Sequence, residues 1–351
     1  MQKTVTIKTL AEALGMSMSG VSKALNDYPD INEETKRTVI EKAIELGYTP
    51  NLNARNLAKN TSNSIGLIVK DTETTYGELI KDLSREAEAK GLNLMVADSD
   101  RSREIERKHV ISMLESRVRG IVIVPVSADI SEIKRIVKFR IPIIFLGGWV
   151  TSANENVVAQ DNVYGTNLAL DYLFSLGHRD IAYISDKVRS NTNQTKIDTY
   201  TKRMEESGLE AVSFIDDRTD LVESGKRQVS MMLESGRHIT AVLASKDLVA
   251  IGAMEEIRSR GLRIPEDISV MGFGGSEASS MPMIDLTTIA QPKKELAESV
   301  VRVLLTQSEA AHEARPIHYF AKPTLVIRKS CRHLPARNNE DNLYPIQREE
   351  K

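Results

Sequence analysis

The stretch MSMSGVSKALN, residues 16–26, combines a short apolar stripe with an open polar face. Val21, Ala24 and Leu25 recur at the spacing of one side of a helix, whereas Lys23 and two serines point to other sides. A helix this short has few hydrogen bonds of its own and is not stable alone. We therefore expect it to pack against neighbouring helices and to leave its short polar side chains accessible.

Two further helices are expected beside this stretch. Before it, apolar residues recur at i, i+3, i+4 and i+7, namely Ile7, Leu10, Ala11 and Leu14. After it, Asn32 is a suitable N-cap for a helix that stops at Gly47, and Ser17 is a suitable N-cap for the stretch itself. Three short helices joined by tight turns predict a helix-turn-helix, whose second helix reads base edges in the DNA major groove with small or flexible polar residues.

The pattern changes after the polar residues 61–64. From there, short apolar runs of strand type alternate with helical stretches: SIGLIV (64–69), NLMVAD (93–98), GIVIVP (120–125), PIIFLG (142–147), NVVAQD (156–161), DIAYIS (180–185), AVSFID (211–216), AVLAS (241–245) and SVMGFG (269–274). Such alternation predicts βαβ units and an α/β fold of parallel sheets covered on both faces. Roughly 270 residues of this pattern are too many for one sheet, so we expect two lobes.

The composition is that of a globular protein without a strong overall charge. The chain has 351 residues, of which 41% are hydrophobic and 27% charged, and a formal net charge of -2. Residues 1–60 hold eight Lys/Arg and seven Asp/Glu, so any DNA binding there must depend on the local placement of charge. Cys331 is the only cysteine, no signal peptide is evident, and no run reaches the roughly 18 apolar residues of a membrane span. We therefore expect a cytoplasmic protein.

Several motifs in register resemble the lactose/galactose-repressor (LacI/GalR) family of bacterial transcription regulators. They are TIKTLAEALGMSMSGVSKALN (6–26), INEETKRTVIEKAIELGYTPNLNARNLAKN (31–60), SIGLIV (64–69), GLRIPEDISVMGF (261–273) and LTTIAQP (286–292), so the resemblance covers nearly the whole chain. It implies a homodimer that binds near-palindromic operator DNA under the control of a small-molecule effector, without a cofactor or a metal. The implied domains are a helix-turn-helix head (1–50), a hinge helix or linker (51–62), a two-lobed periplasmic-binding-protein-like core (63–331) with crossovers near residues 161, 290 and 322, and a tail (332–351) that we expect to be disordered.

The resemblance implies particular DNA contacts in the head. Base reading falls on Met18, Ser19 and Lys23 of the second helix. Met18 could instead belong to the core, because it precedes Val21 by three residues, and Lys23 could be a solvated surface lysine. Phosphate contacts position a protein without specifying sequence, and the residues suited to them are Thr6, Ser17, Ser22 and Asn26.

The hinge resemblance falls on Ala54, Arg55 and Leu57. In the family this segment folds on operator DNA, and its leucine wedges into the minor groove. An apolar wedge of this kind lets a duplex kink and contact more protein. NARNLAKN (53–60) is too short to be a stable helix without DNA, and the alternative is an inert linker.

The effector site is expected beyond the carboxyl ends of the strands, as in other open α/β sheets. The positions that this rule selects are Asp71, Tyr76, Asp98, Asp100, Gly147, Gly148, Trp149 and Asp161 in the first lobe, and Lys196, Lys246, Asp247, Gly274 and Gly275 in the second. Trp149 is suited to hold a sugar or a planar ligand against its ring, although plain packing in the core is the alternative.

Three positions depart from the sugar-binding members of the family. Gly274 stands where an Asp is usual, Lys196 where many members have Arg, and Lys246 where an Asn is common. An acceptor for sugar hydroxyls is lost and two ammonium groups are available, so we expect an anionic effector, for example a sugar phosphate or a carboxylated metabolite. The alternative is that both lysines extend to solvent, and the carboxylates of the first lobe would oppose an anion.

Two other classes of protein share parts of this pattern. A Rossmann-type enzyme is suggested by GFGG (272–275), but Glu277 stands where the dinucleotide fingerprint needs its third glycine. A solute-binding protein would share the two-lobed core, but it would need a signal peptide and no helix-turn-helix. The sequence has no catalytic motif and no metal-ligand spacing, so we expect neither an enzyme nor a metalloprotein.

Overall fold

The computed structural model describes most of the chain, and it divides into two compact units, Met1–Ser62 and Asn63–Lys351. No helix in the described part is long and apolar enough to cross a membrane. The residues described are 5–48, 62–70, 76–138, 141–148, 153–186, 191–216, 220–310 and 315–334.

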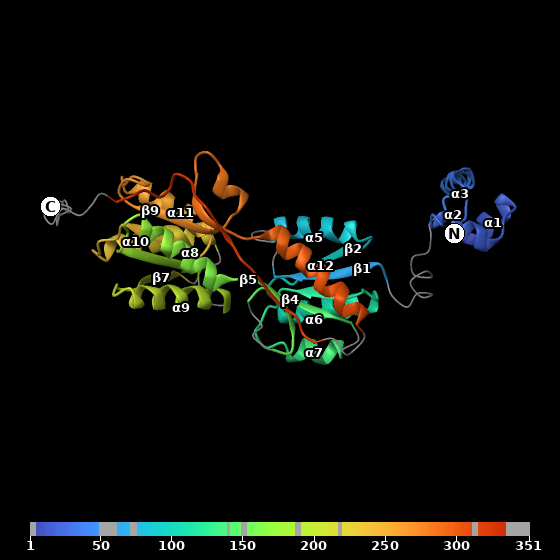
Figure 1. Cartoon of the computed structure of the whole chain (residues 1–351), viewed down its shortest axis with the longest axis horizontal. Coiled ribbons are helices and arrows are strands. Elements are labelled where there is room, and N and C mark those ends of the chain that lie inside the picture. The colour runs from blue at the N-terminus through green and yellow to red at the C-terminus, as the bar shows by residue number, and fades with distance from the viewer. Residues whose placement is uncertain are drawn as a thin grey trace. The chain divides into compact units, whose positions relative to one another are not determined.

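The first unit contains three helices, α1 (Ile7–Leu14), α2 (Met18–Leu25) and α3 (Glu33–Glu45) (Figure 1). Each begins at a capping side chain: Thr6 accepts from the amide of Thr9, Ser17 from that of Gly20, and Asn32 from that of Thr35. Such caps satisfy amides that have no partner within the helix. The apolar face of each helix meets the others in one small core, whose buried residues are Leu10, Ala11, Val21, Ala24, Val39 and Ala43. The predicted three-helix head is thus formed.

The first lobe of the second unit is a six-stranded, wholly parallel sheet in the order β11-β5-β4-β3-β1-β2. Its strands are β1 (Ser64–Val69), β2 (Asn93–Asp98), β3 (Ile121–Ile123), β4 (Ile143–Leu146), β5 (Asn156–Gln160) and β11 (His318–Ala321). Helices α5 (Gly77–Ala89) and α12 (Lys293–Glu309) cover one face. Helices α6 (Arg103–Glu115) and α7 (Ser131–Val137) cover the other.

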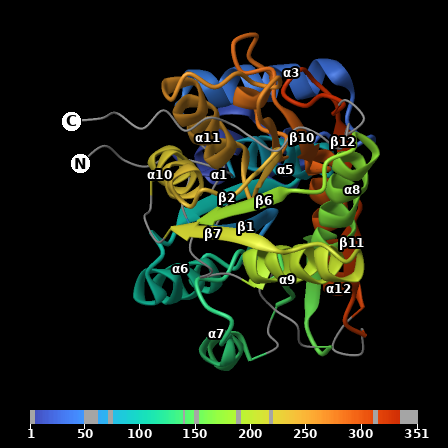
Figure 2. The same cartoon turned by 90° about the vertical axis from the view of Figure 1, so that its left-hand side faces the viewer.

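The second lobe repeats this plan in the order β12-β10-β9-β8-β6-β7. Its strands are β6 (Ile181–Asp186), β7 (Val212–Asp216), β8 (Ala241–Ala244), β9 (Ser269–Gly274), β10 (Thr287–Ala290) and β12 (Thr324–Val326), of which β12 is antiparallel to β10. Figure 2 shows α10 (Leu221–Glu234) and α11 (Asp247–Ser259) on one side of the sheet and α8 (Asn162–Ser175) and α9 (Asn191–Glu206) on the other. A short 3₁₀ helix, η1 (Glu277–Ser280), follows β9.

The chain passes between the lobes three times. It leaves the first sheet after β5 and enters α8, returns from β10 to α12, and crosses again from β11 to β12. Two interleaved α/β lobes with almost wholly parallel sheets confirm the predicted fold class.

The end of the chain differs from the sequence-based expectation in two ways. Strands β11 and β12 were not expected, because both are short and largely exposed and lack the continuous apolar run of a buried strand. Residues 332–334, expected in the disordered tail, belong to the second lobe. The amide of Leu334 donates to Leu176 O (2.9 Å), and His178 Nε2 lies 3.2 Å from Arg332 O. Residues 335–351 lie outside the described residues.

Candidate functional site

The polar face of α2 is accessible. Met18 is 53% exposed, so the alternative that places it in the core is wrong. Ser17 and Ser19 are also exposed, whereas Val21 and Ala24 of the same helix are buried. The accessible side of α2 therefore carries the side chains predicted to read bases.

Lys23 forms an ion pair within the helix-turn-helix head. Its ammonium group donates to Asp30, and both side chains remain about half exposed. The hydrogen bond with Asp30 raises the pKa of Lys23, and the same bond lowers the pKa of Asp30. Lys23 is therefore charged, and its ammonium group has three N–H donors, so it can donate to a base as well as to Asp30.

The residues predicted to contact phosphates already serve the local structure. The hydroxyl of Ser17 accepts from Gly20 N (3.0 Å) and that of Thr6 from Thr9 N (3.3 Å). A hydroxyl that accepts a hydrogen bond can still donate one, so a phosphate oxygen can add to each cap. The side-chain Nδ2 of Asn26 donates to Ser22 O (2.6 Å).

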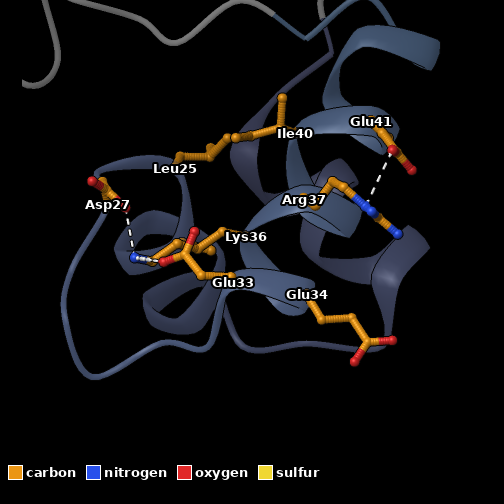
Figure 3. Close-up of a pocket in the computed structure, with 9 residues that line it drawn as sticks. Leu25, Asp27, Glu33, Glu34, Lys36, Arg37, Ile40 and Glu41 are labelled. Atoms are coloured by element: carbon orange, nitrogen blue, oxygen red, sulfur yellow. Dashed lines mark hydrogen bonds and ion pairs between the residues drawn. The ribbon is translucent and has the colours of Figure 1, made fainter.

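A groove of about 660 Å³ lies between α2 and α3, and none of the residues predicted to contact DNA lines it (Figure 3). Lys36 is one of its lining residues and pairs with Asp27 (2.6 Å) and Glu33 (2.7 Å). Ile40 contributes an apolar wall, and Glu41 pairs with an arginine of the same helix. Acidic groups outnumber basic ones among its lining residues, so the groove does not suit a phosphate backbone.

The second lobe gathers polar groups where strands β6, β8 and β9 end. Lys246 Nζ donates to Asp186 Oδ2 (2.8 Å), and Asp186 Oδ1 accepts from Asn193 Nδ2 (3.0 Å) and Ser245 Oγ (3.2 Å). Burial alone would raise the pKa of Asp186, but Lys246 and these donors outweigh it and hold the pKa below its usual value. Sequence reasoning missed Asp186, although it directly follows the predicted strand 180–185 and the strand-end rule selects it.

Lys196 lies beneath this group and is only 5% exposed. Its Nζ donates to Ser245 O (3.0 Å) and lies 3.7 Å from the centroid of the Phe273 ring. Burial, with a smaller contribution from Lys246, lowers the pKa of Lys196 to about 7. The alternative that Lys196 extends to solvent is wrong. Lys246 is partly exposed but is already paired with a carboxylate.

The position of Asp247 accounts for the glycine at position 274. The buried carboxylate of Asp247 accepts from Thr288 Oγ1 (2.5 Å) and from Ser276 N (2.6 Å). Gly274 has φ +134°, a conformation that side chains rarely adopt, and a Cβ there would lie 3.6 Å from Asp247 Oδ2. An Asp at Gly274 would therefore be strained and would bring a second carboxylate towards the first.

The predicted effector residues of the first lobe have structural partners. Asp161 caps α8 by accepting from Tyr164 N (2.8 Å), and Asp98 accepts from Asp100 N (2.8 Å). Tyr76 packs against the apolar core beneath α5. The lobes approach each other where a Cβ on Gly148 would lie 3.4 Å from Thr192 Oγ1 of α9.

Other predicted site residues lie outside the described residues: Ala54, Arg55, Leu57, Asp71 and Trp149. A further groove, of about 510 Å³ between α8 and α9, contains none of the predicted effector residues. Among the described residues, no group of three or more His, Cys, Asp or Glu side chains is placed to hold a metal ion.

Comparison with known proteins identifies the family. Residues 6–51 match the model of bacterial regulatory proteins of the lacI family, and residues 170–331 match the periplasmic binding protein-like domain. The HTH-type transcriptional repressor PurR of Histophilus somni (strain 129Pt) is 30% identical over 94% of this chain and 99% of its own length. The chain belongs to the LacI family. The regulator DegA of Bacillus subtilis (strain 168) is 29% identical over 93% of this chain and 97% of its own.

The fold of this LacI-family regulator also matches solved structures. The Lac repressor dimer bound to operator and the anti-inducer ONPF is 28% identical, with a TM-score of 0.82 over 94% of this chain and 100% of the repressor chain. This LacI-family protein is therefore a DNA-binding transcriptional regulator with an effector-binding core, as the sequence predicted. Its relatives are transcriptional regulators rather than enzymes, which favours this function over the Rossmann-type and solute-binding alternatives.

Proposed function

We propose that this regulator represses transcription as a homodimer on a near-palindromic operator in the cytoplasm, where bacterial operators lie. The observation that carries the proposal is the accessible face of α2, with Met18 and Lys23 above a fully formed apolar core. One head offers few base contacts, and a dimer doubles them on a two-fold symmetric site. Relatives named as repressors support the direction of control.

Exposed apolar side chains support dimerisation of the core. Met95 and Val96 are exposed on β2, which is an edge strand of the first sheet among the described residues. Met281 and Met283 are exposed in the second lobe, and Met283 is 85% exposed. Large apolar groups at a sheet edge favour association. We expect sedimentation to give a dimer at micromolar concentration, whereas a stable monomer would contradict the proposal.

We assign base reading to Met18, Ser19 and Lys23, and phosphate contacts to the capping residues Thr6 and Ser17 together with Ser22 and Asn26. The hinge residues Ala54, Arg55 and Leu57 complete the DNA contacts, with Leu57 as the minor-groove wedge. Capping hydroxyls support the phosphate role because they are fixed in position and accessible.

Lys23→Ala is expected to relax base preference at one position in each half-site. The loss should be roughly 1–3 kcal/mol on the preferred sequence and little on others, because a base contact discriminates and a phosphate contact does not. Selection of bound DNA from a random pool would measure this. Lys42→Ala is the matched control, because Lys42 is also paired within the head, to Glu45 at 2.8 Å, but on α3. An equal loss of affinity on every sequence would assign Lys23 to a phosphate instead.

We propose that the effector binds between the lobes, against Lys196, Lys246, Asp247 and Gly274 of the second lobe and Asp71, Tyr76, Asp98, Trp149 and Asp161 of the first. The pairing of Lys246 with Asp186 weakens its attraction for an anion. Lys196 has no carboxylate within salt-bridge distance among the described residues and remains the better anchor for a negative charge. The proposed effector is thus an anionic metabolite, such as a sugar phosphate, held by protonated Lys196.

The affinity for such an anion is expected to fall as the pH rises above 7. Binding requires the charged form of Lys196, whose pKa of about 7 makes that form scarce in alkaline solution. The loss should reach about 30-fold at pH 8.5, since each pKa unit is a factor of ten. Calorimetric screening of phosphorylated and neutral sugars at pH 6.0 and pH 8.5 tests this. Lys196→Arg should bind without the pH dependence, and a tightly bound neutral sugar indifferent to pH would refute the anionic effector.

A further inference from the structure

A hydrogen-bonded contact joins the two lobes at the second crossover. Glu78, in the first turn of α5, belongs to the first lobe, and Lys293 begins α12 where the chain returns from the second lobe. Lys293 Nζ donates to Glu78 Oε2 and to Gly275 O (3.1 Å). The amide of Glu277, in the second lobe, donates to Glu78 Oε1 (3.1 Å). Both carboxylate oxygens of Glu78 are therefore engaged by groups outside its own helix.

This contact differs from an ordinary surface ion pair. The Lys293 side chain is only 13% exposed and makes two hydrogen bonds. Burial would raise the pKa of Glu78, but Lys293 and the Glu277 amide hold it below its usual value. By contrast, the neighbouring Lys294 is 80% exposed and lies 3.9 Å from Glu298 of the same helix. A partly buried pair with charge-assisted hydrogen bonds is worth more than an exposed one.

The loop between β9 and η1 connects this contact to the proposed effector site. Consecutive amides of the loop donate to carboxylates on different elements. The amide of Ser276 donates to Asp247 Oδ2 (2.6 Å), inside the second-lobe cluster, and that of Glu277 donates to Glu78 on the first lobe. A movement of the loop relative to Asp247 is therefore expected to change its distance from Glu78 when the first lobe stays in place.

We propose that Glu78, Lys293 and the amide of Glu277 form a latch that holds the two lobes in the arrangement described and transmits effector binding from Asp247 to helix α5. The link to the effector rests on the function proposed above. A rotation of the lobes about the crossovers separates Glu78 from Glu277, because these residues lie on different lobes, whereas the bond between Ser276 and Asp247 lies within one lobe. The latch thereby sets the fraction of molecules whose lobes adopt this arrangement, and an effector acts by changing that fraction.

The first test measures the lobes without DNA or effector, so it does not depend on the proposed function. Spin labels on Lys90→Cys and Glu205→Cys, one exposed site on each lobe, report the distance between the lobes in the full-length protein. Cys331 is only partly buried, but burial raises the pKa of its thiol to about 12, and unwanted labelling is limited because only the thiolate reacts readily. Lys293→Met and Glu78→Ala are each expected to broaden or shift the distance distribution, and the double variant should resemble either single variant, because both break one contact. Lys294→Met is the matched control and should leave the distribution unchanged.

Hydrogen exchange at the Glu277 amide supplies a second readout. Glu78→Ala removes its acceptor and should speed exchange about tenfold, the scale expected for one charge-assisted hydrogen bond. The variants Glu78→Ala and Lys293→Met should also shift the response to whichever sugar phosphate or neutral sugar binds in the calorimetric screen. An unchanged distance distribution and unchanged exchange would overturn the latch. A changed distance distribution between the lobes, together with unchanged ligand affinity, would overturn the coupling of the latch to the effector.

Discussion

Replacing Lys196 by methionine is expected to raise the free energy of unfolding of the core by roughly 4 kcal/mol at pH 7. The native site lowers the pKa of Lys196 from 10.5 to about 7, mainly by burial. Between pH 7 and pH 10.5, Lys196 is protonated in the unfolded chain and largely neutral in the folded chain. Protonation of Lys196 therefore favours unfolding. Methionine has a similar length, fits against Phe273 and carries no charge to desolvate.

The pH dependence of this gain distinguishes it from a general packing effect. Between pH 7 and pH 10.5 the unfolded state of the wild type binds more protons than the folded state, so wild-type stability rises with pH. The advantage of Lys196→Met should therefore be full below pH 7 and disappear near pH 10.5. Urea unfolding at several pH values measures it. Lys246→Met should instead destabilise the core, because it leaves the partly buried Asp186 without its ion pair.

A stabilising substitution at this position would also indicate function. A buried lysine that costs stability departs from the usual rules of core packing, and such departures are expected at functional sites. Lys196→Met should thus be more stable and should no longer respond to an anionic effector. A variant with full stability gain and an unaltered response would separate Lys196 from the effector.

The sequence predicted the architecture because the relevant signals are local. The apolar run SIGLIV coincides with β1, and the caps Ser17 and Asn32 begin α2 and α3 as expected. Such signals depend on residues close together in the chain. Strand β12 could not be predicted in the same way, because it has only three residues, none of them buried, and lacks the apolar run of a core strand.

The candidate site was predicted less completely, because its electrostatics depend on tertiary partners. The strand-end rule selected Lys246 and Asp247 but could not predict their partners. Asp186 neutralises Lys246. Thr288 donates a hydrogen bond to Asp247. One sequence feature that indicates the burial of Lys196 was overlooked. Lys196 lies one helical turn before Tyr200, a buried residue of α9, and therefore on the same face of that helix.

Gly252→Ala is expected to destabilise the second lobe by roughly 3 kcal/mol or more. Helices α10 and α11 pack backbone to backbone, since a Cβ on Gly252 would lie 2.0 Å from Val222 O, and one on Gly225 would lie 2.1 Å from Val249 O. No rotation of a side chain can relieve a contact with a backbone carbonyl, so the helices must separate. Helix α11 begins with Asp247, and its displacement would also disturb the effector cluster.

Gly77→Ala is the matched control for this prediction. Gly77 also lies in a helix, at the start of α5, but a Cβ there would meet nothing within 4 Å. Alanine has the higher helix propensity, so this variant should be as stable as the wild type or more stable by up to about 1 kcal/mol. Denaturant unfolding of the two variants isolates the close approach of α10 and α11 from the general effect of replacing glycine. Equal stability of Gly252→Ala and Gly77→Ala would mean that the helices can separate without cost, and that the position of Asp247 does not depend on their contact.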